Sequence, residues 1–215
     1  MPIAPRVLLV TDSRYADAQT LRVVREVGDA LPRGAFGVQL RDNARSRDLV
    51  RGLAERLRVV TRVSGALFVV NGDVALAVDV GADGVHLGGG APAFAVARDA
   101  FPNGWVSVAA HSDADVVRAL DDRADAVLVS PIFETPGKGP PRGLHALERA
   151  AALADPHRLA VYALGGVDAS RASACLAAGA HGVAVIRALL DATDPGAAAR
   201  AILDPETRDP PARLD

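Results

Sequence analysis

Short runs of β-branched and other apolar residues recur along the chain, and each is followed by a longer segment rich in Ala, Leu, Arg and Asp. The short runs predict buried strands, and the longer segments have the apolar spacing of amphipathic helices. Eight strands are expected, over residues 7–11, 37–41, 66–71, 84–87, 105–109, 126–130, 160–164 and 182–185. Helices are expected near residues 17–31, 46–63, 73–80, 91–100, 112–121, 144–154, 169–178 and 194–203. Eight such units of about 27 residues predict a parallel TIM (β/α)8 barrel, with a doubly wound sheet as the alternative.

Three similar turns support this number of units. Residues 81–84, 122–125 and 179–182 each stand between an expected helix and the next strand. A glycine that ends a helix adopts the left-handed conformation without a Cβ clash, so these turns are interpreted as structural. No linker divides the chain, which predicts one domain over residues 1–203, and the Pro-rich, acidic segment 204–215 is expected to be a mobile tail.

The composition narrows the range of partners. Half of the residues are hydrophobic and 23% are charged, which favours a globular protein over a disordered one. The net charge is −2 and no basic block occurs, which argues against a nucleic-acid partner. No apolar run reaches the roughly 18 residues of a membrane span, and the single Cys175 cannot form an intramolecular disulfide. We therefore expect a cytoplasmic protein with small-molecule ligands and no membrane partner, and the sequence leaves homo-oligomerisation open.

Polar residues at the ends of the apolar runs are the candidates for a site, because ligands of a barrel lie at the C-terminal ends of its strands. They are Asp12, Gln39, Arg41, Asn71, His86, His111, residues 130–138, Gly165, Gly166, Ile186 and Arg187. Two of these ends favour a phosphate: Gly165–Gly166 after the seventh strand, and Val185–Arg187, which leads from the eighth strand into a helix. Glycines let backbone N–H groups approach an anion, and a helix N-terminus adds donors and a favourable dipole. The structural alternative is a tight turn that contains two glycines.

Residues 130–143 are expected to form a shaped loop, because their prolines and glycines oppose regular structure. The loop carries Glu134, Thr135 and Lys138, the last of which is the only lysine among 24 basic residues. Such a loop can close over a ligand and bring the Lys138 ammonium to an anionic group. The alternative is a stiff surface connection.

Taken in order, the strand ends resemble those of the thiamine phosphate synthase and TenI (thiazole tautomerase) family. The resemblance extends from Leu9 to Ile186 and is carried by residues 38–41, 69–71, 81–88, 110–112, 130–138 and 164–167. It implies a TIM barrel in which the Gly-Gly and Val-Ile loops hold the phosphate of thiazole phosphate.

The synthase branch of the family joins a pyrimidine diphosphate to thiazole phosphate and releases pyrophosphate with help from magnesium. Magnesium binds hard carboxylate oxygens, which in the synthases follow the strand-three asparagine and lie just beyond His-Leu-Gly. Here those places hold Gly72 and residues 88–91, and a lysine and a serine of the synthases are replaced by Asn43 and Ala109. These four changes argue against a diphosphate site of the synthase kind.

The TenI branch isomerises a thiazole carboxylate phosphate, which requires acid and base groups but no metal. Asn71–Gly72 and Phe133–Thr135 are similar to that branch, whereas Pro131 replaces its histidine.

Three functions remain open on this basis: a TenI-like thiazole tautomerase as the main interpretation, a thiamine phosphate synthase as the alternative, and a non-catalytic thiazole-phosphate-binding protein. The resemblance implies catalytic roles for His111, Glu134 and Lys138, phosphate binding by Gly165, Gly166, Val185, Ile186 and Arg187, and substrate binding by Gln39, Arg41, Asn71, His86 and Thr135. No metal or cofactor is expected unless the synthase interpretation holds, in which case Mg²⁺ would use Asp73 or Asp12. A Rossmann oxidoreductase is disfavoured, because no strand is followed by Gly-x-Gly-x-x-Gly.

Overall fold

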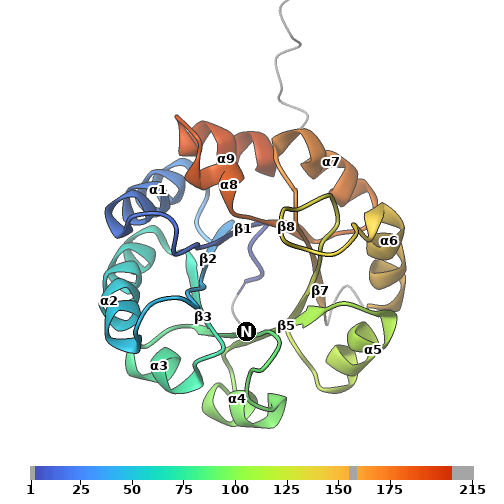
Figure 1. Cartoon of the computed structure of the whole chain (residues 1–215), viewed down its shortest axis with the longest axis horizontal. Helices are drawn as coiled ribbons and strands as arrows, with labels where there is room; N and C mark the ends of the chain where they lie inside the picture. The colour runs from blue at the N-terminus through green and yellow to red at the C-terminus, as the bar shows by residue number, and fades with distance from the viewer. Residues whose placement is uncertain (1–2, 155–158, 205–215) are drawn as a thin grey trace, which may run out of the picture.

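Eight parallel strands close into a barrel surrounded by helices, which confirms the expected TIM fold (Figure 1). A computed structural model describes residues 3–154 and 159–204. The strands are β1 (Val7–Val10), β2 (Phe36–Leu40), β3 (Leu67–Asn71), β4 (Gly84–Leu87), β5 (Trp105–Ala110), β6 (Ala126–Val129), β7 (Ala160–Leu164) and β8 (Gly182–Val185). The helices are α1 (Asp17–Ala30), α2 (Arg47–Ser64), α3 (Val74–Asp79), α4 (Phe94–Ala100), α5 (Asp113–Asp121), α6 (Gly143–Leu153), α7 (Ala169–Ala177), α8 (Arg187–Leu190) and α9 (Pro195–Leu203). The predicted mobile tail lies outside the described residues, apart from Asp204.

Strands that are neighbours in the sequence are neighbours in the barrel, and β8 pairs with β1 to close it. A doubly wound sheet has open edges, so this closure excludes the alternative topology. The expected start of α4 at residue 91 is wrong, because Gly90 adopts a left-handed turn (φ 77°) and the helix begins at Phe94. The short helix α8 was not predicted, since four residues are too few to show a helical period. Within the described ranges no helix has the length and apolar character to cross a bilayer.

The lower part of the barrel interior is filled by apolar side chains. In a strand, alternate residues point to opposite faces, so every second residue of each strand points inward. The inward-facing cluster consists of Leu8, Val10, Leu67, Val69, Trp105, Ala126, Leu128, Tyr162 and Ala184. Trp105 and Tyr162 meet edge to face with their ring centroids 6.4 Å apart. Gly84 gives room beside them, since a Cβ there would lie 1.8 Å from the carbonyl oxygen of Trp105. The N-terminal part of the barrel interior is therefore filled, and a ligand site is restricted to the mouth at the C-terminal ends of the strands.

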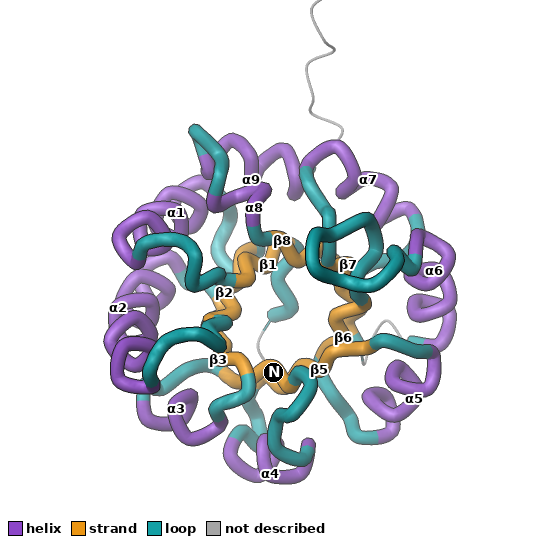
Figure 2. The backbone as a smooth tube through the Cα atoms, viewed as in Figure 1, coloured by secondary structure: helices purple, strands orange, loops and turns teal. Residues whose placement is uncertain are grey.

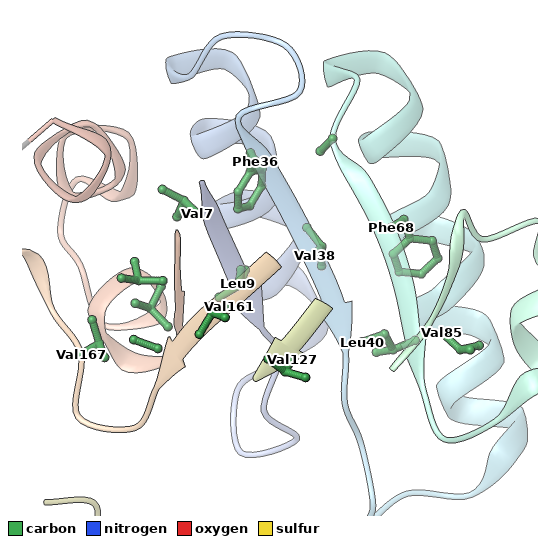
Figure 3. Packing of buried hydrophobic residues seen from close by; sticks show 14 of the residues in the cluster. Val7, Leu9, Phe36, Val38, Leu40, Phe68, Val85, Val127, Val161 and Val167 are labelled. Atoms are coloured by element: carbon green, nitrogen blue, oxygen red, sulfur yellow. The ribbon is translucent and has the colours of Figure 1, made fainter. Parts of the chain in front are cut away.

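The outward-facing residues of the strands pack against the helices in a second, larger core. Figure 3 shows Val7, Leu9, Phe36, Val38 and Phe68 in this layer, all of them buried. Burial of such side chains contributes about 1.5–3 kcal/mol each relative to exposure, so this layer holds the strands in place and fixes the mouth of the barrel.

Two of the three repeated turns hold neighbouring strands together at the N-terminal face through a carboxylate, which is buried for Asp125 and half-buried for Asp83. Asp125 accepts hydrogen bonds from the backbone N–H of Val106 (2.7 Å) and from Arg98 (2.8 Å). Asp83 does the same with the backbone N–H of Phe68 (2.8 Å) and with Arg58. These turns lie at the opposite end of the barrel from the mouth, which agrees with their structural interpretation.

We expect Asp125→Ala to lower the free energy of unfolding by about 2–4 kcal/mol, because it leaves the Val106 N–H without its acceptor and removes the carboxylate that pairs with Arg98. Urea denaturation followed by circular dichroism measures this change. Asp121→Ala, at the exposed end of α5, is the matched control and should change stability by no more than about 0.5 kcal/mol. An equal, small effect of both substitutions would contradict the role assigned to Asp125.

Candidate functional site

The inward-facing residues become polar where the strands reach the mouth of the barrel. Gln39 is 2% exposed, and its Nε2 donates to Oδ1 of Asn71 at 3.2 Å. The other end of the same amide, Oε1 of Gln39, is buried and has no hydrogen-bond partner among the described residues. A buried acceptor without a partner costs about 1–3 kcal/mol. Gln39 is therefore arranged to accept a hydrogen bond from a ligand.

His86 lies beside this amide pair, in register with Asn71 on the neighbouring strand. Its Nδ1 is hydrogen-bonded to Oγ of Ser107, 3.0 Å away on β5. Burial, together with the charge of Arg41, lowers the pKa of His86 from 6.5 to about 4. The imidazole is therefore neutral near pH 7 and serves as a hydrogen-bonding group in the wall of the mouth.

A cavity of about 240 Å³, called here the central pocket, occupies the mouth of the barrel. Its lining consists of Val10, Gln39, Arg41, Asn43, Asn71, His86, Gly88, Gly89, Ala109, His111, Ser130, Pro131, Thr135, Lys138, Leu164, Gly165 and Ile186. The side chains of Arg41 and Lys138 form no hydrogen bond or ion pair within the described residues. Among the described residues the pocket thus presents two cationic groups without side-chain partners, beside the amides of Gln39 and Asn71 and the neutral His86, which suits an anionic ligand.

His111 stands at the edge of the central pocket with a defined tautomer. Its Nδ1 lies 3.2 Å from the carbonyl oxygen of Ser130, and its backbone N–H donates to the Asp115 carboxylate at 2.9 Å. A carbonyl only accepts hydrogen bonds, so Nδ1 carries a proton and Nε2 is the ring nitrogen left for a ligand. This arrangement allows His111 to take up a proton from a ligand in the pocket.

A second cavity, the glycine compartment, adjoins the central pocket and measures about 380 Å³. Its lining consists of Glu134, Thr135, Leu164, Gly165, Gly166, Val167, Asp168, Arg171, Ala184, Val185, Ile186, Arg187, Ala188 and Asp191. Gly165 and Gly166 both have positive φ, 98° and 64°. A Cβ on Gly166 would lie 2.7 Å from the carbonyl oxygen of Glu134. Only glycine fits this turn, and a backbone without side chains at the wall of a cavity is of the kind that binds phosphate.

The loop between β6 and α6 packs on this turn and forms a wall of both cavities. It lies over the end of β7 in Figure 2, where Ile132 N–H donates to the carbonyl of Leu164 and Phe133 N–H to that of Gly165. Arg171 of α7 fixes the same region, since its guanidinium stacks on the Phe133 ring at 4.9 Å and donates to the Gly166 carbonyl at 2.6 Å. Sequence reasoning missed Arg171, because nothing in the spacing of an α7 residue indicates contact with a loop almost 40 positions earlier.

The structure divides the predicted site residues between the two cavities. The predicted phosphate-binding residues Gly165, Gly166, Val185, Ile186 and Arg187 all line the glycine compartment. The predicted substrate-binding residues Gln39, Arg41, Asn71, His86 and Thr135 all line the central pocket. Of the three predicted catalytic residues, His111 and Lys138 line the central pocket, whereas the exposed Glu134 lines the glycine compartment and is apart from them.

The two carboxylates considered as metal ligands are both engaged elsewhere. Asp12 forms an ion pair with Arg14 (2.6 Å), and Asp73 caps α3 and forms an ion pair with Arg47 (2.8 Å). These arginines lower the pKa of Asp12 and of Asp73. Neither residue lines the central pocket, and the described part of the chain contains no cluster of three His, Cys, Asp or Glu side chains that could hold a metal. The donor set at the mouth therefore does not fit magnesium, which prefers carboxylate oxygens.

Comparison with known proteins supplies a family for this barrel. Residues 7–189 match the TMP-TENI family model, which is described as thiamine monophosphate synthase. The thiamine-phosphate synthase of Roseiflexus sp. (strain RS-1) is 40% identical over 203 residues, which cover 91% of this chain and 83% of that protein. The bifunctional protein ThiM/ThiE of Symbiobacterium thermophilum is 44% identical over 155 residues, which are 70% of this chain but 32% of that relative's length. Among solved structures, thiamine phosphate pyrophosphorylase from Pyrococcus furiosus superimposes with a TM-score of 0.80 at 27% identity, covering 92% of this chain and 93% of that one.

Gly166→Ala tests whether the glycine compartment binds phosphate. The positive φ and the close Glu134 carbonyl force the turn to move, so we expect the affinity for inorganic phosphate to fall about tenfold or more. Isothermal titration calorimetry measures this affinity. Gly52→Ala on α2 is the control, because a Cβ there meets nothing within 4 Å and should leave phosphate binding as it is. Equal binding by the two variants would contradict a phosphate site at Gly166.

His86 should make the stability of the barrel depend on pH. Its folded pKa of about 4 lies below the ordinary value of 6.5, so the unfolded chain binds the proton more tightly. The resulting contribution is fully present above pH 6.5 and is lost as the pH falls towards 4, by about 3 kcal/mol. Urea unfolding at a series of pH values should show a smaller loss for His86→Gln than for the wild type over this range. Parallel curves for the two proteins would be evidence against a buried, neutral His86.

Proposed function

The chain belongs to the TMP-TENI family, and from this premise we propose that it joins a pyrimidine diphosphate to thiazole phosphate, forming thiamine phosphate and pyrophosphate. The observation that carries the proposal is the pair of adjoining cavities, each with cationic side chains in its lining, which share Thr135, Leu164, Gly165 and Ile186. A reaction between two phosphorylated substrates needs two such cavities, whereas an isomerisation of one substrate needs one. The synthase names of relatives near 40% identity support the same reaction.

In this proposal the glycine compartment holds the phosphate of thiazole phosphate. The turn at Gly165 and Gly166 offers backbone N–H groups, and Arg187 at the start of α8 adds a guanidinium. The compartment opens to the central pocket at Thr135, so the thiazole ring would extend into the mouth of the barrel. This orientation brings the ring to the side of the pocket that carries Lys138.

The central pocket would hold the pyrimidine diphosphate. Oε1 of Gln39 is a buried acceptor that awaits a donor, and an amino group on a pyrimidine ring supplies one. Arg41 and Lys138 are the cationic groups of the pocket, their side chains have no partner among the residues that the structure describes, and they suit the diphosphate. The neutral His86 contributes hydrogen bonding but no charge to this pocket.

The proposed reaction forms one bond and breaks one. The lone pair of the thiazole ring nitrogen forms a C–N bond with the methylene carbon of the pyrimidine, and the C–O bond to the diphosphate breaks. The electron pair of that C–O bond leaves with the diphosphate, and the ring nitrogen becomes positively charged. No proton is transferred, so the demands on the protein are alignment of the two substrates and stabilisation of the departing negative charge.

A thiazole tautomerase is the second candidate, and His111 is the observation that favours it. Its Nε2 is available as a base at the edge of the central pocket, and an isomerisation by proton transfer requires no carboxylate-bound metal. A third function, binding of thiazole phosphate without turnover, would use the glycine compartment alone.

One assay with both substrates distinguishes these functions. We expect the wild-type chain to form thiamine phosphate from thiazole phosphate and the pyrimidine diphosphate, as measured by chromatography of the product. Lys138→Ala should lower kcat/KM about 10- to 100-fold, because it removes a cationic group from the departing diphosphate, and Lys138→Arg should retain part of the rate.

Arg25→Ala is the control: it removes an exposed cation from α1 that lines neither cavity, and it should retain the wild-type rate. Conversion of the thiazole carboxylate phosphate tautomer without any thiamine phosphate, and loss of that conversion in His111→Ala, would instead establish the tautomerase. Tight binding of thiazole phosphate without either product would leave the binding protein.

A further inference from the structure

The carboxylates around the β1–β3 side of the mouth are all satisfied by the chain itself. Asp12 follows β1, Asp42 follows β2 and Asp73 follows β3, so each stands where a strand delivers its residues to the mouth. None of the three lines the central pocket, whose described lining contains no Asp or Glu. Whether these carboxylates give this side of the mouth a negative charge therefore depends on which cationic groups they contact.

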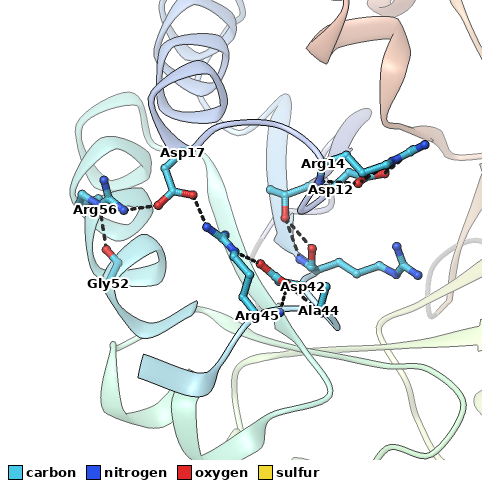
Figure 4. A network of polar contacts seen from close by, with 10 residues as sticks. Asp12, Arg14, Asp17, Asp42, Ala44, Arg45, Gly52 and Arg56 are labelled. Atoms are coloured by element: carbon cyan, nitrogen blue, oxygen red, sulfur yellow. Dashed lines mark hydrogen bonds and ion pairs between the residues drawn. The ribbon is translucent and has the colours of Figure 1, made fainter. Parts of the chain in front are cut away.

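Both oxygens of the Asp12 and Asp42 carboxylates have donors. Arg14 binds Asp12 through its backbone N–H on Oδ1 (3.0 Å) and through its guanidinium on both oxygens. The backbone N–H groups of Ala44 and Arg45 donate to Oδ1 of Asp42, and the Arg45 guanidinium donates to Oδ2. Figure 4 shows these contacts and the continuation of the network from Arg45 to Asp17.

The Asp73 carboxylate is satisfied in the same way. Its Oδ1 accepts from the Leu76 N–H at 2.8 Å, and Arg47 donates to Oδ2 at 2.8 Å. A divalent cation at any of these three carboxylates would have to displace a guanidinium that is bound to it. The arginines thus neutralise the carboxylates that a metal ion would need as ligands.

The side chains of Arg41 and Lys138 differ from those of these arginines, because they form no hydrogen bond or ion pair within the described residues. The backbone of Arg41 is held on both sides by Thr11, whose Oγ1 accepts from the Arg41 N–H at 2.9 Å and donates to the Arg41 carbonyl at 3.1 Å. Lys138 enters from the loop between β6 and α6. The pocket therefore has positive charge on two walls and no negative side chain to hold a metal between them.

We infer that the central pocket binds a diphosphate group through Arg41 and Lys138 without a divalent metal ion, which rests on the proposed function for the identity of the anion. The guanidinium and the ammonium replace the metal as the positive charge that stabilises the departing diphosphate. The C–O electron pair is then received by an anion already hydrogen-bonded to fixed side chains.

Calorimetry with inorganic pyrophosphate tests this inference on the full chain. We expect the wild type to bind pyrophosphate in excess EDTA at least as tightly as in excess magnesium, since no metal-bound contact is lost and magnesium in solution competes for the anion. Arg41→Gln should weaken binding in EDTA about tenfold or more, because a charged donor is removed. Arg22→Gln, which breaks an exposed ion pair with Glu26 on α1, is the matched control and should bind like the wild type. Circular dichroism should be the same for all three proteins, because the Arg41 guanidinium has no structural partner among the described residues.

Pyrophosphate binding that appears only with magnesium would overturn the inference, and so would equal binding in EDTA by Arg41→Gln and the wild type. The coupling assay in EDTA separates this from the proposed function. Thiamine phosphate formed in EDTA supports both, and product formed only with magnesium overturns the metal-free site but leaves the function. If pyrophosphate binds in EDTA and no product forms under either condition, the proposed function fails and the metal-free anion site stands.

Discussion

The alternation of side chains along eight closed, parallel strands determines where this protein can bind anything. Every second residue of each strand points into the barrel, and the lower inward positions are filled by residues such as Trp105, Leu128 and Tyr162. The next inward positions along neighbouring strands are Gln39, Asn71 and His86, at the mouth. The same pleat that builds the apolar floor thus gathers polar groups above it, and the large outer core holds them in fixed positions.

Electrostatics at the mouth follow from how arginines are distributed among the carboxylates. Asp12, Asp42 and Asp73 are each bound by an arginine that lies close by in the chain or on a neighbouring helix. Arg41 is left out of this pairing, since its Asp neighbour at position 42 is bound by Arg45. A positive pocket in a chain of net charge −2 is therefore a local product of pairing and cannot be read from composition.

Much of the fold could be predicted, because strand and helix periods differ and eight repeats of one unit leave few topologies. The polar residues at strand ends could also be identified, since their positions follow directly from the strand boundaries. Contacts between segments far apart in the sequence could not be predicted. The stacking of Arg171 on Phe133 and the separation of Glu134 from His111 depend on how the β6–α6 loop folds back over Gly165 and Gly166, which has no periodic signal in the sequence. The capture of Asp73 by Arg47 likewise joins two helices whose relative position only the closed barrel defines.

The β6–α6 loop couples the two cavities, because it contributes Thr135 to both and Lys138 to one. Its backbone is bonded to Leu164 and Gly165, and Arg171 links it to Gly166. An anion bound to the turn at Gly165 and Gly166 would contact the same backbone that holds the loop. Binding in the glycine compartment would therefore affect where the loop holds the Lys138 ammonium in the central pocket. A lysine suits this position, since a compact ammonium on a flexible stem can reach an anion from an exposed loop, whereas Arg41 follows directly at the end of β2 and needs no such reach. Lys138 and Arg41 thus bring their charges to the central pocket from two different supports, a loop anchored on β7 and α7 and the end of a barrel strand.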